Sequence, residues 1–298
     1  MKDQAEKLRI LTRNVKQQIE AEIDTVPKRK HTRVIAVTSG KGGVGKTNIA
    51  LNLAISISEL GEKVILLDAD MGLGNVDIIV GLIPRYNLYD LIKREKSIRE
   101  IMITGPKGIQ IIPGGSGIFQ MADLKEWDLR MIVDELGSLD GESDYLIVDT
   151  GAGIASNVLN FALTADEIII VTTPEPTSIT DAYGIIKTAT LRKARGKFHL
   201  IVNRVESKSE GDAVGKNIEY VCKRFLNVKV NILGHVMEDS KVHNAVMQQQ
   251  ALMLMAPSSI AAQNVRGIAH SLCGVNAQPR VEPIGIKDFF RRLVKSLE

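Results

Sequence analysis

The sequence has few aromatic residues, only two cysteines and no long apolar run. Phe, Trp and Tyr make up 4% of the 298 residues, so the core must be filled mainly by aliphatic side chains, as in a parallel sheet covered by helices. Cys222 and Cys273 lie far apart, which excludes a disulfide framework and a CxxC metal pair, and offers no ligand set for an iron–sulfur cluster. No apolar run reaches the roughly 18–20 residues of a membrane span. The polar N-terminus does not resemble a secretory signal, so we expect a cytoplasmic protein.

The charge is concentrated at the two ends of the chain. The net charge is +3, with +3 in residues 1–30 and +2 in residues 284–298, which leaves about −2 for the residues between them. A nonspecific nucleic-acid binder would carry a basic body. We also expect no sequence-specific nucleic-acid partner.

Residues 40–47, GKGGVGKT, match the phosphate-binding loop pattern. An apolar run over residues 34–37 precedes the loop, and a helical pattern over residues 48–54 follows it. Glycines allow backbone N–H groups to close around phosphate oxygens at a helix N-terminus. We expect Lys46 to reach the β- and γ-phosphates of a nucleotide, and the Thr47 hydroxyl to hold Mg²⁺. The residues predicted to bind the nucleotide here are Gly40, Lys41, Gly42, Gly43, Val44, Gly45, Lys46, Thr47 and Asn48.

Apolar β-branched runs alternate with helical patterns between about residues 32 and 273. This predicts an α/β fold, a doubly wound and mostly parallel sheet of about seven to eight strands flanked by helices. Ligands then bind at the C-terminal ends of the strands. The predicted strands are Arg33–Thr38, Lys63–Asp68, Ile109–Pro113, Tyr145–Asp149, Glu167–Thr172, His199–Asn203 and Ile232–Val236.

Three charged residues are placed for phosphate chemistry. Asp70 lies just past an apolar strand, where a carboxylate can orient the water that attacks a γ-phosphate. Asp149 ends another apolar strand, as the carboxylate on the Mg²⁺ side requires. Lys41 is a second lysine within the loop, which cannot easily reach the phosphate held by its own chain but could reach one across a dimer interface. The alternative for Lys41 is an exposed loop lysine.

Amphipathic helices are predicted at both ends of the chain. Residues 3–24 carry a narrow apolar stripe that suits docking on a partner, or packing on the chain's own domain. The second helix follows a proline-containing linker and has a basic opposite face, a pattern that favours an anionic bilayer interface. Docking in a groove of its own core is the alternative, and both can hold in different nucleotide states. Its apolar face consists of Ile286, Phe289, Phe290, Leu293, Val294 and Leu297.

Several motifs resemble those of the MinD/ParA family of deviant P-loop ATPases. These are GKGGVGKT with its extra lysine, DADMGLGNVD at residues 68–77 and YLIVDTGAG at residues 145–153. DQAEKLR at residues 3–9, TTPEPTSITDAYGIIK at residues 172–187 and the C-terminal helix are similar to the flagellar-regulator branch of that family (FlhG, also called YlxH or FleN). The likeness extends over nearly the whole chain.

The resemblance implies an ATP-hydrolysing switch that controls flagellar number and placement. Its expected cofactors are ATP or ADP and Mg²⁺, with Lys46, Lys41 and Asp70 in catalytic roles, and Thr47 and Asp149 on the metal side. Lys41 would reach the partner's phosphates in an ATP-bound homodimer. Asn203 would read the adenine, Glu175 would lie near the partner's nucleotide, and Asp181 would pair with Lys41. Met237 stands near the base, where relatives often have a proline.

The resemblance also implies partners for the two ends. The C-terminal helix would bind the inner face of the cell membrane reversibly when ATP drives dimerisation. Flagellar C-ring proteins are further expected partners. The N-terminal motif would stimulate the signal-recognition-type GTPase FlhF through Asp3, Gln4, Ala5, Leu8 and Arg9.

Other functions remain open at the level of sequence. A MinD-like division-site regulator and a ParA-type DNA partition ATPase share the core motifs, and a scaffold that only binds nucleotide would share the loop. The predicted domains are an N-terminal arm with its linker (1–31), an ATPase domain (32–276), and a linker with the C-terminal helix (277–298).

Overall fold

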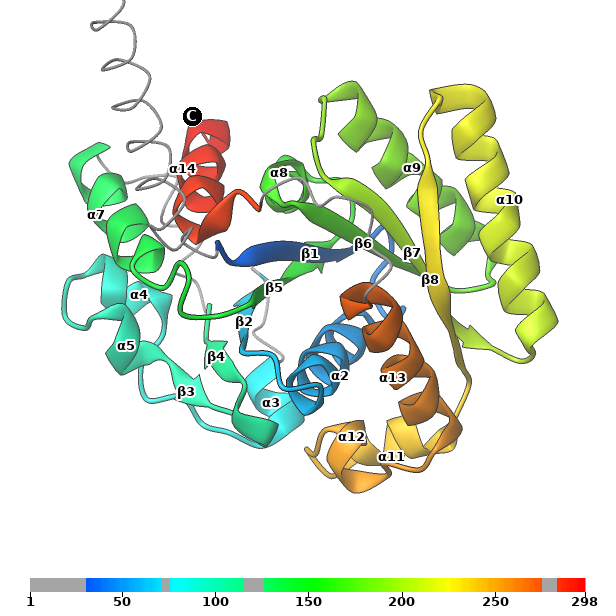
Figure 1. The fold of residues 1–298 in the computed structure, drawn as a ribbon, viewed down its shortest axis with the longest axis horizontal. Helices are drawn as coiled ribbons and strands as arrows, with labels where there is room; N and C mark the ends of the chain where they lie inside the picture. The colour runs from blue at the N-terminus through cyan, green and yellow to red at the C-terminus, as the bar shows by residue number, and fades with distance from the viewer. Residues whose placement is uncertain (1–30, 71–75, 115–125, 275–282, 298) are drawn as a thin grey trace, which may run out of the picture. The chain divides into compact units, whose positions relative to one another are not determined.

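The computed structural model describes residues 31–70, 76–114, 126–274 and 283–297, and the fold below is that of these residues. Their strands form one sheet in the order β3-β4-β2-β5-β1-β6-β7-β8 (Figure 1). β3 pairs with β4 in the antiparallel direction, and every other pair is parallel. The strands are β1 (Arg33–Ser39), β2 (Val64–Ala69), β3 (Ile103–Thr104), β4 (Gln110–Ile112), β5 (Tyr145–Ala152), β6 (Glu167–Thr172), β7 (Lys197–Val205) and β8 (Val230–Met237).

This arrangement confirms the predicted doubly wound, mostly parallel sheet. The seven predicted strands are all present, with small shifts at their ends. β3 escaped prediction because a two-residue edge strand has too little sequence to show a period. From β1 the chain first crosses to β2 and β4 on one side, returns to β5 beside β1, and then continues through β6, β7 and β8 on the other side. β1 therefore lies where the winding reverses, the switch point at which α/β sheets bind ligands.

Helices cover both faces of the sheet. Many begin at side-chain caps: Asn87, Ser207, Asp239 and Ser259 each accept a hydrogen bond from a backbone N–H in the first turn of the helix that follows. The helices are α2 (Lys46–Glu59), α3 (Val76–Val80), α4 (Leu88–Ile92), α5 (Ile98–Ile101), η1 (Pro106–Gly108, a 3₁₀ helix), α7 (Glu126–Gly137), α8 (Ser156–Thr164), α9 (Pro176–Leu191), α10 (Lys208–Leu226), α11 (Ser240–Met247), α12 (Leu252–Met255), α13 (Ile260–Cys273) and α14 (Gly285–Leu297).

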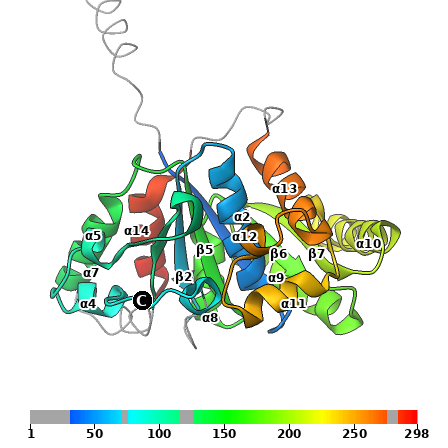
Figure 2. The ribbon, with the colours of Figure 1, turned by 90° about the horizontal axis from the view of Figure 1, so that it is seen from below.

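The alternation of side chains along β1 divides the core in two. Ile35 and Val37 pack with α2 and α13, whereas Val34 and Ala36 pack with α7, α8 and α14. Figure 2 shows α14 beside α5 and α7, on the opposite side of β2 and β5 from α2 and α13. A third cluster joins β6, β7 and β8 to α9 and α10. The C-terminal helix is therefore part of the core in this structure.

Candidate functional site

The glycine-rich loop joins the end of β1 to the start of α2. Gly43 and Gly45 have φ angles of 80° and 90°, which side-chain-bearing residues rarely adopt. A Cβ atom at Gly45 would also lie 2.4 Å from the amide nitrogen of Asn203. No side chain caps the N-terminus of α2. The first N–H groups of this helix therefore point at the place where a phosphate is expected to bind.

Lys46 lies between two of the predicted carboxylates. Its Nζ atom is 2.8 Å from Oδ1 of Asp149 and 3.7 Å from Oδ2 of Asp70, and the lysine is 7% exposed. The Thr47 hydroxyl is 3.5 Å from the same ammonium. The structure thus brings together Lys46, Thr47, Asp70 and Asp149, which come from three separate segments of the chain.

Asp149 is fully buried at the end of β5. Burial raises the pKa of its carboxyl group, and the charge of Lys46 opposes that increase. Its second oxygen, Oδ2, has no hydrogen-bond partner among the described residues. A buried carboxylate oxygen without a partner, close to a threonine hydroxyl, suits a hard cation such as Mg²⁺. Thr47 and Asp149 therefore fit the role of holding Mg²⁺, the latter directly or through water.

Asp68 organises the chain around Asp70. Its Oδ1 atom accepts the N–H of Asp70 at 3.1 Å, and its Oδ2 atom accepts the N–H of Val76 at 3.1 Å. Asp68 is 3% exposed, whereas the Asp70 side chain is 24% exposed and so accessible to water. From the sequence, Asp68 was only the last residue of a predicted strand and the first residue of the DADMGLGNVD motif. Its position just inside β2 is what allows it to bond both neighbours.

Lys41 forms an exposed ion pair with Glu175. Their side-chain atoms are 2.6 Å apart, and the Lys41 ammonium is also 3.4 Å from the Thr177 hydroxyl. The hydrogen bond from Lys41 holds the pKa of the Glu175 carboxyl below its usual value. The expected partner, Asp181, instead packs on Gly40, where an added Cβ atom would lie 2.5 Å from that of Asp181. The predicted Lys41–Asp181 pair is therefore wrong for this structure, because Glu175 at the start of α9 is in reach.

A cavity of about 600 Å³ opens beside the loop, between α2, the ends of β7 and β8, and α11. Asn203 lies in its wall, and its amide donates a hydrogen bond of 2.7 Å to the carbonyl of Val44. The backbone N–H of Met237 donates to Oδ1 of Asn264, 3.1 Å away on α13. A proline at position 237 would lack that donor. Asn264 could not be predicted as part of this site from the sequence, because no local pattern links it to the loop.

The predicted apolar face of α14 lies against the rest of the molecule. Ile286, Phe289, Phe290 and Leu293 are each no more than 2% exposed, and Val294 is partly buried. The Phe289 ring packs edge-on against Phe290 and obliquely against Phe161 of α8. The Leu297 side chain lies outside what the structure describes. The sequence allowed this helix either to lie in a bilayer interface or to dock in a groove of its own core, and this structure contains the docked helix.

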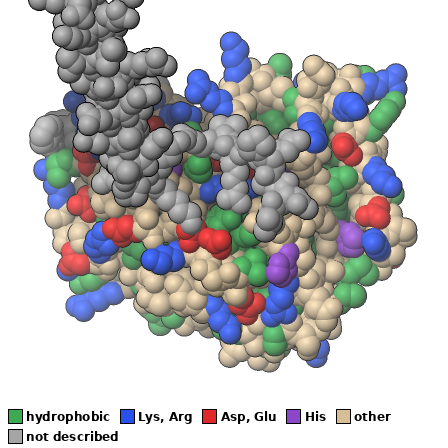
Figure 3. Space-filling view, viewed as in Figure 1, with side chains coloured by type: hydrophobic (Ala, Val, Ile, Leu, Met, Phe, Trp, Pro, Cys, Tyr) green, Lys and Arg blue, Asp and Glu red, His purple; other side chains and the backbone are tan. Residues whose placement is uncertain are grey.

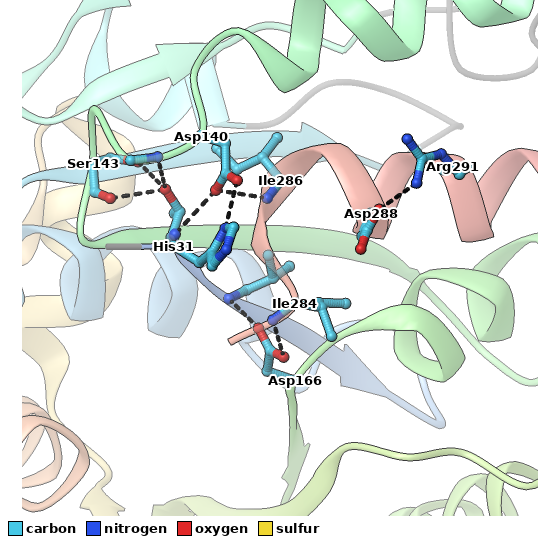
Figure 4. Close-up of polar contacts among 11 residues, drawn as sticks. His31, Asp140, Ser143, Asp166, Ile284, Ile286, Asp288 and Arg291 are labelled. Atoms are coloured by element: carbon cyan, nitrogen blue, oxygen red, sulfur yellow. Dashed lines mark hydrogen bonds and ion pairs between the residues drawn. The ribbon is translucent and has the colours of Figure 1, made fainter. Parts of the chain in front are cut away.

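Two aspartates fasten the start of α14. Oδ1 of Asp140 accepts the N–H of Ile286 at 3.1 Å, and Oδ1 of Asp166 accepts the N–H of Ile284 at 3.0 Å (Figure 4). Gly285, between them, has a φ angle of 76°, and a Cβ atom there would lie 2.5 Å from Asp140. Glycine is therefore required at this position.

The same aspartates hold the beginning of the described chain. Asp140 also bonds the N–H of Thr32 at 3.1 Å and lies 2.9 Å from Nδ1 of His31, and Asp166 accepts the N–H of Val34 at 2.9 Å. Burial raises the pKa of Asp166, and the two backbone N–H groups oppose that increase. Neither aspartate was singled out from the sequence, since their partners are more than 100 positions away.

Two further predictions concern residues or properties outside this site. The proposed partner-activating residues, Asp3, Gln4, Ala5, Leu8 and Arg9, lie outside the described residues. Across the residues that the structure describes, no helix combines the length and apolar character needed to span a bilayer.

Comparison with known proteins identifies the family. An AAA domain family model matches residues 32–201. Antiactivator FleN of Pseudomonas aeruginosa is 38% identical over 265 residues, covering 88% of this chain and 94% of FleN. Flagellum site-determining protein YlxH of Helicobacter pylori is 37% identical over 271 residues, covering 90% of this chain and 91% of YlxH. The MinC:MinD cell division complex of Aquifex aeolicus superposes with a TM-score of 0.68 at 27% identity, over 83% of this chain and 98% of that one.

The chain belongs to the MinD/ParA family of P-loop ATPases. It groups with FleN and YlxH, as the sequence motifs predicted. Its enzymatic activity is ATP hydrolysis, which agrees with the glycine-rich loop and the buried lysine at its end.

Proposed function

We propose that this MinD/ParA-family ATPase is a switch that controls the number and placement of flagella. Its similarity to an antiactivator of the FleN type and to a flagellum site-determining protein supports this role. The observation that carries the switch is the state of α14, a basic amphipathic helix whose apolar face is buried but held by only a few polar contacts.

Hydrolysis in this proposal depends on the residues that surround Lys46. Lys46 leaves Asp149 to bind the nucleotide phosphates, and Asp70, which is accessible to water, orients the attacking molecule. Thr47 and Asp149 hold Mg²⁺, which neutralises phosphate charge when bound. The cavity beside Asn203 receives the base. A Pyrococcus horikoshii MinD complexed with Mg-ADP shares the fold, with a TM-score of 0.67, but at 23% identity it supports only the fold.

The proposed active form is an ATP-bound homodimer. Lys41 and Glu175 are 43% and 59% exposed, and exposed ion pairs contribute little to stability. A phosphate of the nucleotide bound to a second copy of the chain can therefore replace Glu175 as the partner of Lys41 with little loss of free energy. This gives Lys41 a role that its position within its own chain does not explain.

Membrane attachment follows from the energetics of α14. Burying an aliphatic or aromatic side chain contributes about 1.5–3 kcal/mol, so the four buried residues of α14 contribute at most about 6–12 kcal/mol. Undocking into water would lose most of that free energy. A bilayer interface restores it, and anionic headgroups attract the basic face of the helix. We therefore propose a protein that attaches reversibly and peripherally to the inner face of the cell membrane.

Two partner roles rest on the family resemblance. The N-terminal motif at residues 3–9 is proposed to stimulate the GTPase FlhF, and the ATPase domain to contact flagellar C-ring proteins. A synthetic peptide of residues 1–20 should accelerate GTP turnover by FlhF, and the same peptide with Gln4→Ala should not. Equal rates with and without the wild-type peptide would remove this role.

The membrane switch can be tested by sedimentation with vesicles of phosphatidylcholine and phosphatidylglycerol, in ATP and in ADP. We expect binding in ATP only, and its loss in Phe290→Asp. Because Phe290 is also a core residue, the double variant Arg292→Gln/Lys295→Gln provides a second test on the basic face of α14. Ile83→Asp, at a position 96% exposed, is the control. Equal binding of all proteins in both nucleotides would contradict the proposal.

A division-site regulator is the second candidate. The septum site-determining protein MinD of Synechocystis is 32% identical over 247 residues, covering 81% of this chain and 90% of that protein. Deleting the gene distinguishes the two functions. A change in flagellar number without minicells supports the flagellar role, and minicells with normal flagella support the MinD-like role.

A further inference from the structure

One edge of the molecule carries a dense group of cations. The segments 191–197 (LRKARGK) and 223–229 (KRFLNVK) contain seven Lys or Arg residues and no acidic residue. They end helices α9 and α10 and lead into β7 and β8. We call this group the basic rim: Arg192, Lys193, Arg195, Lys197, Lys223, Arg224 and Lys229, all of them exposed.

The sheet brings the two segments together. Phe198 of β7 lies opposite Val230 of β8 in the parallel register, so Lys197 and Lys229, which immediately precede them, are neighbours. Ala194, Leu226 and Val228 turn into the hydrophobic cluster that α9 and α10 share, and the charged side chains face outward. Lys and Arg side chains, with hydrophobic ones among them, are visible along this edge at the upper right of Figure 3.

The charges of the basic rim are not neutralised within the described residues. No carboxylate there lies within ion-pair distance of any of the seven side chains. The Arg192 guanidinium donates to the Ser156 hydroxyl, at 3.3 Å, and that of Arg224 donates to the Tyr220 hydroxyl, at 2.7 Å. Cations are favoured at helix C-termini, which accounts for Lys223 and Arg224 in the last turn of α10 and for Arg192, the C-cap of α9. It does not account for Arg195, Lys197 or Lys229, which lie beyond the helices.

Large apolar side chains are exposed among these cations. Leu191 is 71% exposed, Phe225 65% and Tyr220 57%. The Arg224 guanidinium lies 5.5 Å from the centre of the Phe225 ring and 5.8 Å from that of Tyr220. Aromatic rings and basic groups side by side are typical of surfaces that lie at lipid headgroups.

The basic rim is also continuous with the start of α14. The backbone carbonyl of Asp166 accepts the N–H of Lys197 at 3.0 Å, and the side chain of the same residue accepts the N–H of Ile284 at 3.0 Å. If α14 leaves its groove, Ile284 is the point from which it departs. A bilayer that binds the released α14 therefore lies next to the basic rim. Binding of a nucleic acid to the rim would not require the rim to lie beside the start of α14.

We propose that the basic rim is a second contact with an anionic phospholipid bilayer, made together with α14. The inference rests on the proposed membrane attachment of α14. A second contact, on a surface other than α14, would fix the orientation of the attached protein. The nucleotide site then lies at the opposite ends of the strands, away from the lipid. Each cation near an anionic surface is expected to strengthen binding about fivefold.

The test is sedimentation of the full chain in ATP with vesicles of phosphatidylcholine, with and without phosphatidylglycerol. The triple variant Lys193→Gln/Lys197→Gln/Lys229→Gln should bind anionic vesicles on the order of 100-fold more weakly than wild type. Its ATP turnover and melting temperature should be unchanged. The control, Lys208→Gln/Lys216→Gln/Lys241→Gln, removes the same charge from exposed positions of α10 and α11 that lie away from the basic rim, and it should bind as wild type does. The difference should shrink at high salt.

The outcomes separate this inference from the proposed function. If Phe290→Asp abolishes vesicle binding but the triple variant binds normally, the basic rim is not a lipid contact and the switch stands. If wild type does not bind vesicles at all, both proposals fail. If the triple variant binds vesicles normally but loses salt-sensitive binding to duplex DNA that wild type has, the rim serves nucleic acid and the lipid assignment is overturned.

Discussion

The ammonium group of Lys46 lies 2.8 Å from Oδ1 of Asp149, and both side chains are buried. The charge of Lys46, the proposed phosphate-binding lysine, is thus balanced by Asp149, the carboxylate proposed to support the metal. Replacing Asp149 by Asn keeps the shape but removes the charge. We expect ATP turnover to fall on the order of 100-fold or more, since metal-side charge is worth several kcal/mol in the transition state. Phosphate release measures this, and ADP affinity without Mg²⁺ is the control for an intact loop. Unchanged turnover would remove Asp149 from the metal site.

The second prediction separates chemistry from binding at Asp70. Asp70→Ala should reduce turnover by about 10²–10⁴-fold, the range typical of a residue that positions or activates a nucleophile. ATP binding and ATP-dependent dimerisation should remain. Size-exclusion chromatography in ATP and in ADP, with phosphate release, tests both. Asp77→Ala, in the first turn of α3, is a nearby control that should behave as wild type. A variant of Asp70 that hydrolyses ATP at the wild-type rate would exclude its catalytic role.

The third prediction concerns the exposed pair of Lys41 and Glu175. Lys41→Ala should leave the melting temperature of the nucleotide-free chain unchanged, because an exposed ion pair contributes little. The same change should abolish dimerisation in ATP. Glu175→Ala removes the acidic partner of the same ion pair but keeps Lys41, so this variant should still dimerise in ATP. Light scattering of both variants decides the matter, and equal behaviour of the two would mean that Lys41 acts only through Glu175.

A buried network at the N-terminal ends of the strands predicts a pH dependence of stability. Glu167 contacts Arg33, and one of its oxygens lies 2.9 Å from His199. Burial alone raises the pKa of Glu167, but its contacts with His199 and Arg33 outweigh burial and lower the pKa from 4.5 to about 2. Because the folded-state pKa is depressed, the stabilisation is present above about pH 4.5 and is lost as the pH falls toward 2.

This network can be measured by comparing wild type with Glu167→Gln in urea. Near neutral pH the variant should be less stable by about 3 kcal/mol, the value that follows from the pKa shift. The difference should shrink as the pH falls from about 4.5 toward 2. A difference that stays constant over that range would mean that the carboxylate charge of Glu167 does not contribute to stability.

The fifth prediction tests how α14 is fastened. Asp166 accepts one backbone N–H on each oxygen, from Val34 and Ile284. An asparagine can accept only one of them, and an unmade buried hydrogen bond costs about 1–3 kcal/mol. Asp166→Asn should therefore speed hydrogen exchange in α14. Asp288→Asn, which breaks only the exposed pair with Arg291 seen in Figure 4, should not. Equal exchange in both variants would show that Asp166 does not hold the helix.

The parts of this molecule that could be predicted from sequence are those encoded locally. The glycine-rich loop, the buried strands and the carboxylates at their ends are each defined within about ten residues. The pairing of Lys41 was predicted with the wrong acid, since two acidic residues lie near the start of α9 and only packing selects Glu175. The basic rim could not be found by counting charge, because the residues between the two ends sum to a slightly negative value.

The contacts that hold α14 and the cavity wall in place also could not be predicted from the sequence. Asn264 holds Met237 across 27 positions, and Asp140 reaches Ile286 across 146. Such pairs follow from the order of the strands, which no local period encodes. The amphipathic pattern of α14 correctly indicated a helix in need of a surface, but it did not say which surface.

The sharing of Asp140 and Asp166 between the two ends has a practical consequence for anyone who alters this chain. A tag, a dye or a truncation placed just ahead of β1 disturbs the same acceptors that seat Ile284 and Ile286. Experiments that shorten the front of the protein to study one activity will therefore also loosen the back of it, and each should carry a probe at both places.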